Sequence, residues 1–207
     1  AFLSALDRLM AGGVRSAGVD VHGETAATES YAERRPVKKG SRKKTKRNVK
    51  VLYISPLKAL GVDVTKNLEL PLRGIAQQCE AMGLPVPDVE VAMRSGDSTP
   101  EQRRKIVSHP PDILVTTPES LFLLLTSKAS SILAGVVVDE VHAVAGSKRG
   151  AHLALSLERL DDMIGHPVQR IGLSATVNPV EEVARFLGGS QPVTVVNPGA
   201  VPAMDLR

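Results

Sequence analysis

Residues 135–142, with the sequence GVVVDEVH, constrain the fold of this chain more than any other stretch. A glycine and three valines in a row are typical of a strand that is buried on both faces, as strands are in parallel sheets covered by helices. Two acids, Asp139 and Glu140, follow at once. Open parallel sheets bind ligands outside the carboxyl ends of their strands, so this pattern predicts a site where the strand ends.

The acid pair suits a hydrated Mg²⁺ ion. Asp139 can hold the ion, usually through water, while Glu140 can orient and polarise an attacking water molecule. The chemistry that this pair indicates is nucleotide hydrolysis. The residues alone leave a second interpretation open, in which the two acids only end the strand and cap the next segment of the chain.

Other strands alternate with helices along the chain. Short apolar runs predict strands at 51–54, 89–93, 112–116, 169–173 and 193–196, in addition to the strand at 135–139. Right-handed crossovers would align these strands in parallel, which gives a three-layer α/β fold with a sheet covered by helices. The polar residues that follow the strands then share one edge of the sheet: Ser55, Arg94, Gly96, Thr116, Thr117, Asp139, Glu140, His142, Ser174 and Thr176.

Proline, glycine and capping residues set the expected helix boundaries. The helix that follows residue 60 is expected to be interrupted or restarted at Pro71 and to stop at Gly83. Thr99, Pro100 and Gln102 form the pattern of an N-cap, a first helical proline and a capping box. A short helix is therefore expected to start there.

The positive charge of the chain is local. Residues 34–50 hold ten of its 26 basic residues and no acid, so 16 basic residues stand against 22 acidic ones elsewhere, although the net charge is +4. Residues 12–50 show no sustained period, and we expect a disordered basic insertion within one domain that spans residues 1–207. The insertion either attracts nucleic-acid phosphate or is a solvated loop.

Cysteine usage and hydropathy bear on the compartment. The single cysteine, Cys79, excludes an internal disulfide framework and fits a reducing environment. No apolar run reaches the length of a membrane span. We therefore expect a cytoplasmic protein with no membrane partner.

Four blocks of the chain resemble motifs of one family, in the family's order. They are similar to the first motor domain of superfamily 2 nucleic-acid helicases, which has a RecA-like fold: 55–60 (SPLKAL) resembles motif Ia, 116–121 (TTPESL) motif Ib, 139–142 (DEVH) the Walker B or DExH box, and 174–176 (SAT) motif III. Residues 94–98 (RSGDS) and 148–153 (KRGAHL) are most similar to the large helicase-related (Lhr) family. The resemblance implies ATP and Mg²⁺ as cofactors and single-stranded or tailed duplex DNA or RNA as a partner.

The resemblance also implies catalytic roles for individual residues. Asp139 would hold Mg²⁺ on the ATP phosphates, and Glu140 would act on the hydrolytic water, so that both lie at the cofactor. His142 would link that site to motif III. Ser174 and Thr176 would then couple hydrolysis to movement of the strand.

A second set of residues would contact the nucleic-acid backbone. Motifs Ia and Ib would grip it through backbone N–H groups and the hydroxyls of Thr116 and Thr117, which suits movement independent of base sequence. The residues implied in this contact are Ser55, Pro56, Leu57, Lys58, Arg94, Gly96, Thr116, Thr117 and Pro118.

One part of the family pattern is absent from the sequence. No G-x-x-x-x-G-K-[S/T] phosphate loop occurs, and residues 1–3 resemble the helix directly after that loop. The resemblance therefore implies a partial domain without its first strand and phosphate loop. It also implies two partners from the same protein, the N-terminal segment and a second RecA-like domain. We expect the isolated chain to be inactive and unstable alone.

Two other functional classes stay open. An ATP-independent nucleic-acid-binding module, or a decayed motor domain, would bind through residues 34–50 and the loops of motifs Ia and Ib. A metal-dependent hydrolase would use Asp139 and Glu140 without a nucleotide, but it would need further metal ligands that the sequence does not offer.

Overall fold

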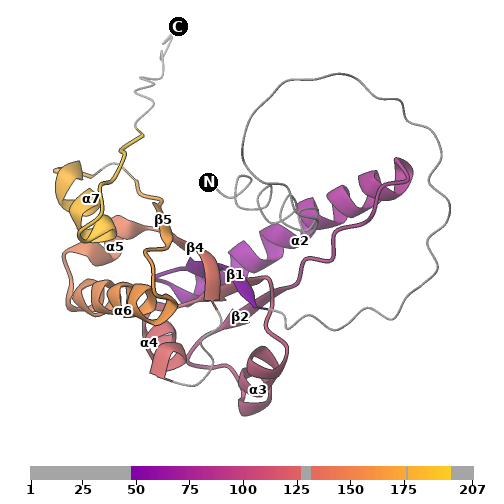
Figure 1. Cartoon of the computed structure of the whole chain (residues 1–207), viewed down its shortest axis with the longest axis horizontal. Helices are drawn as coiled ribbons and strands as arrows, with labels where there is room; N and C mark the ends of the chain where they lie inside the picture. The colour runs from indigo at the N-terminus through magenta and orange to yellow at the C-terminus, as the bar shows by residue number, and fades with distance from the viewer. Residues whose placement is uncertain (1–47, 127–131, 176, 197–207) are drawn as a thin grey trace, which may run out of the picture.

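The computed structural model describes residues 48–126, 132–175 and 177–196, and it places a β-sheet between helices (Figure 1). The elements follow one another in the order β1 (Val49–Ile54), α2 (Lys58–Ala81), β2 (Val91–Arg94), α3 (Pro100–Ser108), β3 (Ile113–Thr116), α4 (Pro118–Thr126), β4 (Ile132–Val138), α5 (Val141–Ala145), α6 (Lys148–Ile164), β5 (Gln169–Gly172) and α7 (Val180–Gly188). Strands thus alternate with helices, as the sequence predicts.

The five strands form one sheet in the order β2-β3-β1-β4-β5, and every neighbouring pair is parallel. The register sets Ile54 of β1 beside Thr116 of β3 and Val138 of β4. It also sets Arg94 of β2 beside Thr116. Because these four strands end together, the residues that follow them meet at one edge, which is where open parallel sheets bind their ligands.

Side chains of the sheet alternate between two apolar layers. Leu52 and Ile54 of β1 are fully buried in the layer covered by α4 and α6, whereas Val51 and Tyr53 belong to the opposite layer, where Leu68 of α2 lies. Each aliphatic side chain that is fully buried in such a layer stabilises the fold by about 1.5–3 kcal/mol. The expected three-layer α/β architecture is confirmed.

Local capping signals also match the structure. The Thr99 side chain accepts a hydrogen bond from the Gln102 N–H (3.2 Å), and the Gln102 Oε1 accepts one from the Thr99 N–H (2.8 Å). These two bonds form the predicted capping box, and Pro100 opens α3. Gly83 adopts a φ of 65° just after α2, which confirms it as the stop of that helix.

Two predicted features are wrong. α2 runs without interruption from Lys58 to Ala81, so Pro71 lies inside one helix. The proline removes one intrahelical hydrogen bond, but contacts between α2 and the sheet, through residues such as Leu68, hold the helix together. Residues 193–196 form no strand: Val196 is 84% exposed, and no strand of the described residues pairs with this segment. An apolar run alone does not supply a pairing partner.

Residues 1–3, which resemble a helix of the family, and the basic segment at 12–47 lie outside the described residues. Of the expected insertion, the described part holds residues 48–50, and two of these belong to β1. The ordered sheet therefore begins slightly earlier than expected. Among the helices described, none is both long enough and apolar enough to cross a membrane.

Candidate functional site

Asp139 is the first residue after β4, and hydrogen bonds fix its position. Its backbone N–H donates to the carbonyl of Ile54 (2.9 Å). Its Oδ2 accepts from the Tyr53 hydroxyl (2.7 Å), and its Oδ1 accepts from the Glu140 N–H (3.0 Å). A carboxylate offers about four lone-pair positions, so these two bonds orient the group and leave it free to accept from metal-bound water. The carboxylate therefore lies at the sheet edge in a defined orientation.

Tyr53 is a part of the site that no motif identifies. It lies in β1 with 4% of its surface exposed, and it pairs in register with Val137, two residues before Asp139. Burial raises the pKa of its phenol, and the hydrogen bond to Asp139 raises it further. The phenol therefore keeps its proton near neutral pH and acts as a donor to the carboxylate.

Glu140 occupies a strained backbone position. Its φ and ψ are both 46°, in the left-handed region, and it is the one non-glycine residue of the described chain with a positive φ. This conformation costs an L residue roughly 1–2 kcal/mol. Such strain is concentrated at functional sites, where the surrounding structure enforces it. Here the turn allows α5 to start directly after Glu140.

His142, in α5, joins Glu140 to the segment after β5. Its Nε2 lies 3.3 Å from Glu140 Oε2, and its Nδ1 lies 3.3 Å from both the Ser174 hydroxyl and the Ala175 N–H. A backbone N–H can only donate, so Nδ1 accepts and the neutral imidazole carries its proton on Nε2, which donates to Glu140. A continuous polar chain thus runs from Glu140 to Ser174. Thr176, the other expected coupling residue, lies outside the described residues.

The threonine hydroxyls expected to contact a nucleic acid point inward. Thr116 is 1% exposed, and its Oγ1 donates to the carbonyl of Arg94 (2.9 Å). Thr117 is 8% exposed, and its Oγ1 bonds Ser120 at the start of α4. In this structure the two hydroxyls connect β3 to β2 and cap α4, and their contact with a nucleic acid stays a prediction. Both lie at the end of a buried strand, where an unpaired hydroxyl would be costly.

Other residues of the expected nucleic-acid contact divide into an exposed and a buried group. Ser55 is 1% exposed, and its hydroxyl donates to the carbonyl of Leu57 (3.0 Å). The exposed members are Leu57, Lys58 and Gly96, and the buried members are Ser55, Pro56, Arg94, Thr116, Thr117 and Pro118. Among the residues expected to make this contact, the accessible groups are therefore backbone, an aliphatic side chain and one lysine.

The loop at residues 95–98 is attached to helices on both sides. Lys58, at the start of α2, forms an ion pair with Asp97. Arg103 of α3 donates to the carbonyl of Gly96 (2.7 Å). The exposed turn that follows β2 is consequently held in place beside the turn that follows β1.

Arg149, in the first turn of α6, is another residue that sequence reasoning missed. Its Nε donates to Glu119 of α4 (2.5 Å), and an Nη donates to the carbonyl of Pro56 (2.9 Å). The hydrogen bond from Arg149 lowers the pKa of Glu119. A cation in the first turn of a helix opposes the helix dipole, so helix stability does not explain its position. The arginine connects the loop after β1 to the first turn of α4, which follows β3.

Two carboxylates lie next to each other at the sheet edge. Asp139 presents carboxylate oxygens that would suit a largely hydrated Mg²⁺ ion, and Glu140 directly beside it carries the carboxylate expected to act on water. The orienting bond from Tyr53 to Asp139 resembles the outer-shell contacts that support metal ligands in general. The donor set therefore fits the ion that the sequence predicts.

Comparison with known proteins adds a family and several relatives. A family model described as "DEAD/DEAH box helicase" matches residues 23–184. The chain is 53% identical over 210 residues to the "Lhr helicase/uracil glycosylase" of Escherichia coli, and the match covers 100% of this chain and 12% of that protein. It is 44% identical over 158 residues to the "ATP-dependent helicase Lhr-Core" of Methanocaldococcus jannaschii, covering 74% of this chain and 18% of that protein.

Solved structures agree with this result. A structure of the Mycobacterium smegmatis helicase Lhr "bound to ssDNA and AMP-PNP" superposes with a TM-score of 0.70 and 61% identity, over 72% of this chain and 20% of that one. The DEAD-box helicase Mss116 shares the fold at a TM-score of 0.54 and 16% identity, over 67% of this chain and 28% of that one. The chain thus spans less than a third of the length of each of these proteins.

Proposed function

This chain belongs to the DEAD/DEAH box helicase family, and from that premise we propose that it forms part of an ATP-dependent helicase or translocase of the Lhr type that acts on DNA or RNA. It would contribute the Walker B acids, the coupling segment after β5 and the strand-binding loops after β1, β2 and β3. The observation that carries the proposal is the polar chain from Glu140 through His142 to Ser174, beside the oriented carboxylate of Asp139.

The relatives support the nature of the ligands. The Lhr structure of M. smegmatis contains ssDNA and AMP-PNP by its own description, and other relatives are named ATP-dependent helicases. We propose that this chain acts on the same two classes of ligand, a nucleoside triphosphate with Mg²⁺ and a single strand. The proposed compartment is the cytoplasm, where both are available.

In the proposed hydrolytic step, the protein groups orient the attacking water and hold the metal ion beside the phosphates. Mg²⁺, when bound, neutralises the developing charge on the phosphates. Asp139 would hold that ion, and Tyr53 would keep its carboxylate oriented. Glu140 would align the attacking water. Its carboxylate accepts a hydrogen bond from His142 Nε2, and His142 Nδ1 contacts Ser174. A movement of the Glu140 side chain during the reaction would therefore shift His142 and the segment that starts at Ser174.

On the nucleic-acid side, we propose contacts to the backbone of one strand. Backbone N–H groups near Leu57 and Gly96, together with the Lys58 ammonium, would meet phosphates, and these contacts carry no base information. This fits a motor that moves along any sequence. Other segments of the protein would supply the phosphate cradle, because this sequence contains no G-x-x-x-x-G-K-[S/T] run. The chain by itself would then be inactive in ATP hydrolysis.

The proposal is tested by replacing His142 in the complete protein. In the His142→Ala variant we expect strand binding within about twofold of wild type, because the strand-binding loops do not contact His142. We expect less stimulation of ATP hydrolysis by single-stranded DNA or RNA and little strand displacement per ATP. His166→Ala, which changes an exposed histidine after α6, is the matched control and should behave like wild type. A complete wild-type protein without nucleic-acid-stimulated hydrolysis would contradict the proposed function.

A further inference from the structure

Three arginines gather where β2 meets α3. Arg94 ends β2 with only 8% of its surface exposed, although arginine is almost never so buried without a partner. Arg103 bonds the carbonyl of Gly96, while its Nε is buried and has no hydrogen-bond partner within the described residues. A solvent-open surface cavity of about 430 Å³ lies among these residues, and its lining consists of Arg94, Arg103, Arg104, Val107 and Ser108.

The charges in this cavity are not compensated. Its lining contains no carboxylate. Burial lowers the pKa of Arg94, and the positive charge of Arg103 lowers it further, which shows that the two guanidinium groups repel each other. Arginine nevertheless stays protonated, since its pKa is far above neutrality. A buried guanidinium with a second positive charge beside it is stabilised when an anion binds between them.

We propose that Arg94, Arg103 and Arg104 form a pocket for a phosphodiester group of the bound strand. This inference rests on the proposed function, since it names a contact of the same nucleic acid. Guanidinium groups match phosphate oxygens through paired N–H donors. The aliphatic side chain of Val107 has no polar group that could form a base-specific hydrogen bond. The contact would therefore add affinity and register without sequence preference.

The position of the pocket fits the path of a strand along the sheet edge. The Arg94 carbonyl accepts from Thr116, which ends β3. The Arg103 side chain fixes Gly96, which lies in the exposed turn after β2. A strand that meets the turns after β1 and β3 would thus reach this pocket when it continues past the last strand of the sheet, β2.

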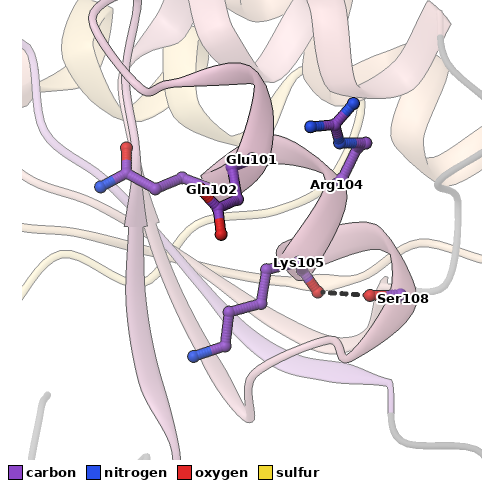
Figure 2. A pocket seen from close by; sticks show the side chains of 5 residues that line it. All are labelled: Glu101, Gln102, Arg104, Lys105 and Ser108. Atoms are coloured by element: carbon purple, nitrogen blue, oxygen red, sulfur yellow. Dashed lines mark hydrogen bonds between the residues drawn. The ribbon is translucent and has the colours of Figure 1, made fainter.

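The helix α3 provides its own control. Figure 2 shows Arg104 and Lys105 pointing to different sides of the helix, with Ser108 bonded to the carbonyl of Lys105. Both side chains are exposed and carry one positive charge, but only Arg104 lines the cavity that also contains Arg94. Replacing either one removes the same charge from the same helix.

The test measures the salt dependence of strand binding by the complete protein. A single-stranded oligonucleotide of fixed length is titrated at several salt concentrations with wild type, Arg104→Gln and Lys105→Gln. For a lost phosphate contact we expect the slope of log Kd against log salt to fall by about 0.7 and binding at low salt to weaken roughly three- to tenfold in Arg104→Gln. Lys105→Gln should retain the wild-type slope.

A second variant tests the geometry of the buried arginine. Arg94→Lys keeps the charge but loses the paired donors, so we expect weaker binding with the wild-type slope, in a protein with an unchanged circular dichroism spectrum. Equal slopes for wild type and Arg104→Gln would overturn the pocket, as would equal losses in the Arg104 and Lys105 variants. A further measurement is the stabilisation of the wild-type protein against thermal unfolding by inorganic phosphate. If Arg104→Gln abolishes that stabilisation but leaves the salt slope of strand binding unchanged, the proposed strand contact would be overturned, because the pocket would bind only free phosphate. No strand binding by wild type would instead reject the proposed function itself.

Discussion

Single residues at the sheet edge act through neighbours that are distant in sequence. Tyr53 and Asp139 are 86 positions apart, and Arg149 is 93 positions from Pro56, yet each pair shares a hydrogen bond. These bonds exist because parallel pairing brings β1, β3 and β4 into one register. A residue to which no motif assigns a role can thus control the geometry of one that a motif identifies.

The first prediction at this scale concerns Tyr53. Tyr53→Phe removes the donor to Asp139 and keeps the buried ring, so the carboxylate loses its fixed orientation. Loss of such supporting bonds typically costs 10–100-fold in metal affinity or activity, and we expect a shift of about that size in the Mg²⁺ concentration for half-maximal nucleotide binding. Direct titration with Mg²⁺ and a non-hydrolysable nucleotide measures it in the complete protein. An unchanged midpoint would show that the hydrogen bond has no positioning role.

A second prediction concerns Arg149 and Glu119. Both side chains are about half exposed, so their ion pair should contribute at most about 1 kcal/mol to stability. We expect Arg149→Lys and Glu119→Gln each to weaken strand binding, and the double variant to weaken it by less than the sum, because both changes break the same connection between α6 and α4. Arg185 and Glu182 form an exposed pair on α7, and the same cycle there should leave strand binding unchanged. Additive losses at Arg149 and Glu119 would contradict the connection.

The same pair has a pH dependence whose sign follows from the pKa shift. Arg149 lowers the pKa of Glu119 in the folded protein. The contribution of the pair is therefore complete above the unfolded pKa of a glutamate and is lost as the pH falls through the lower, folded pKa. The coupling measured in the double-variant cycle should disappear in this acidic range.

The sequence predicted the positions of the two acids but not the hydrogen bonds that the surrounding polar side chains form. Asp139 and Glu140 could be predicted because an abrupt change from valines to acids marks the end of a buried strand. The internal bonds of Thr116 and Thr117 could not, because a motif does not say whether a hydroxyl faces solvent or the neighbouring strand. Thr116 in fact donates to Arg94, a partner that only the strand register specifies.

For single helices and strands, the sequence predicted correctly those boundaries that depend on neighbouring residues alone. The capping box of Thr99 and Gln102 and the stop at Gly83 follow from backbone groups within a few residues. The continuity of α2 through Pro71 and the lack of a strand at 193–196 depend on contacts with other elements. Sequence periodicity does not contain that information.

Packing between α5 and α6 leads to a prediction about Gly150. A Cβ at this position would lie 2.0 Å from the carbonyl oxygen of Val144, which belongs to α5. Gly150→Ala should therefore separate the helix that carries His142 from the one that carries Arg149, and destabilise the protein by about 1–3 kcal/mol. Thermal and denaturant unfolding of the complete protein would measure this loss.

The matched control is Gly74→Ala in α2. A Cβ at Gly74 meets no atom within 4 Å, and the helix interior favours alanine by about 0.5–1 kcal/mol. This variant should be neutral or slightly stabilising. Two equally destabilised variants would show that the loss at Gly150 does not come from the contact with Val144.

At the scale of the whole molecule, the fold follows from alternation and handedness. A chain that alternates short apolar strands with helices can form a parallel sheet with all strand ends on one side, and the five strands of the described residues do so here. The order of the strands was not predictable in detail, since alternation and handedness leave it open. That order nevertheless decides which loops share the edge with Asp139.

The charge of the molecule also separates into two parts. The net charge of +4 arises from residues 34–50, and the rest of the chain is acidic overall. Arg94, Arg103 and Arg104 therefore form a local positive site on an acidic body. Steering of a polyanion to such a site depends on ionic strength, which is why salt dependence is the informative measurement.

We propose that Glu140 acts on the water that attacks a nucleotide, and replacing this one carboxylate examines that role. Glu140→Gln preserves shape and removes the charge that accepts from His142. In the complete protein with saturating single strand, we expect the rate of ATP hydrolysis to fall by a factor on the order of 10²–10⁴, as for other general bases, with strand binding within about twofold of wild type. Hydrolysis at the wild-type rate in that variant would show that Glu140 does not act on the attacking water.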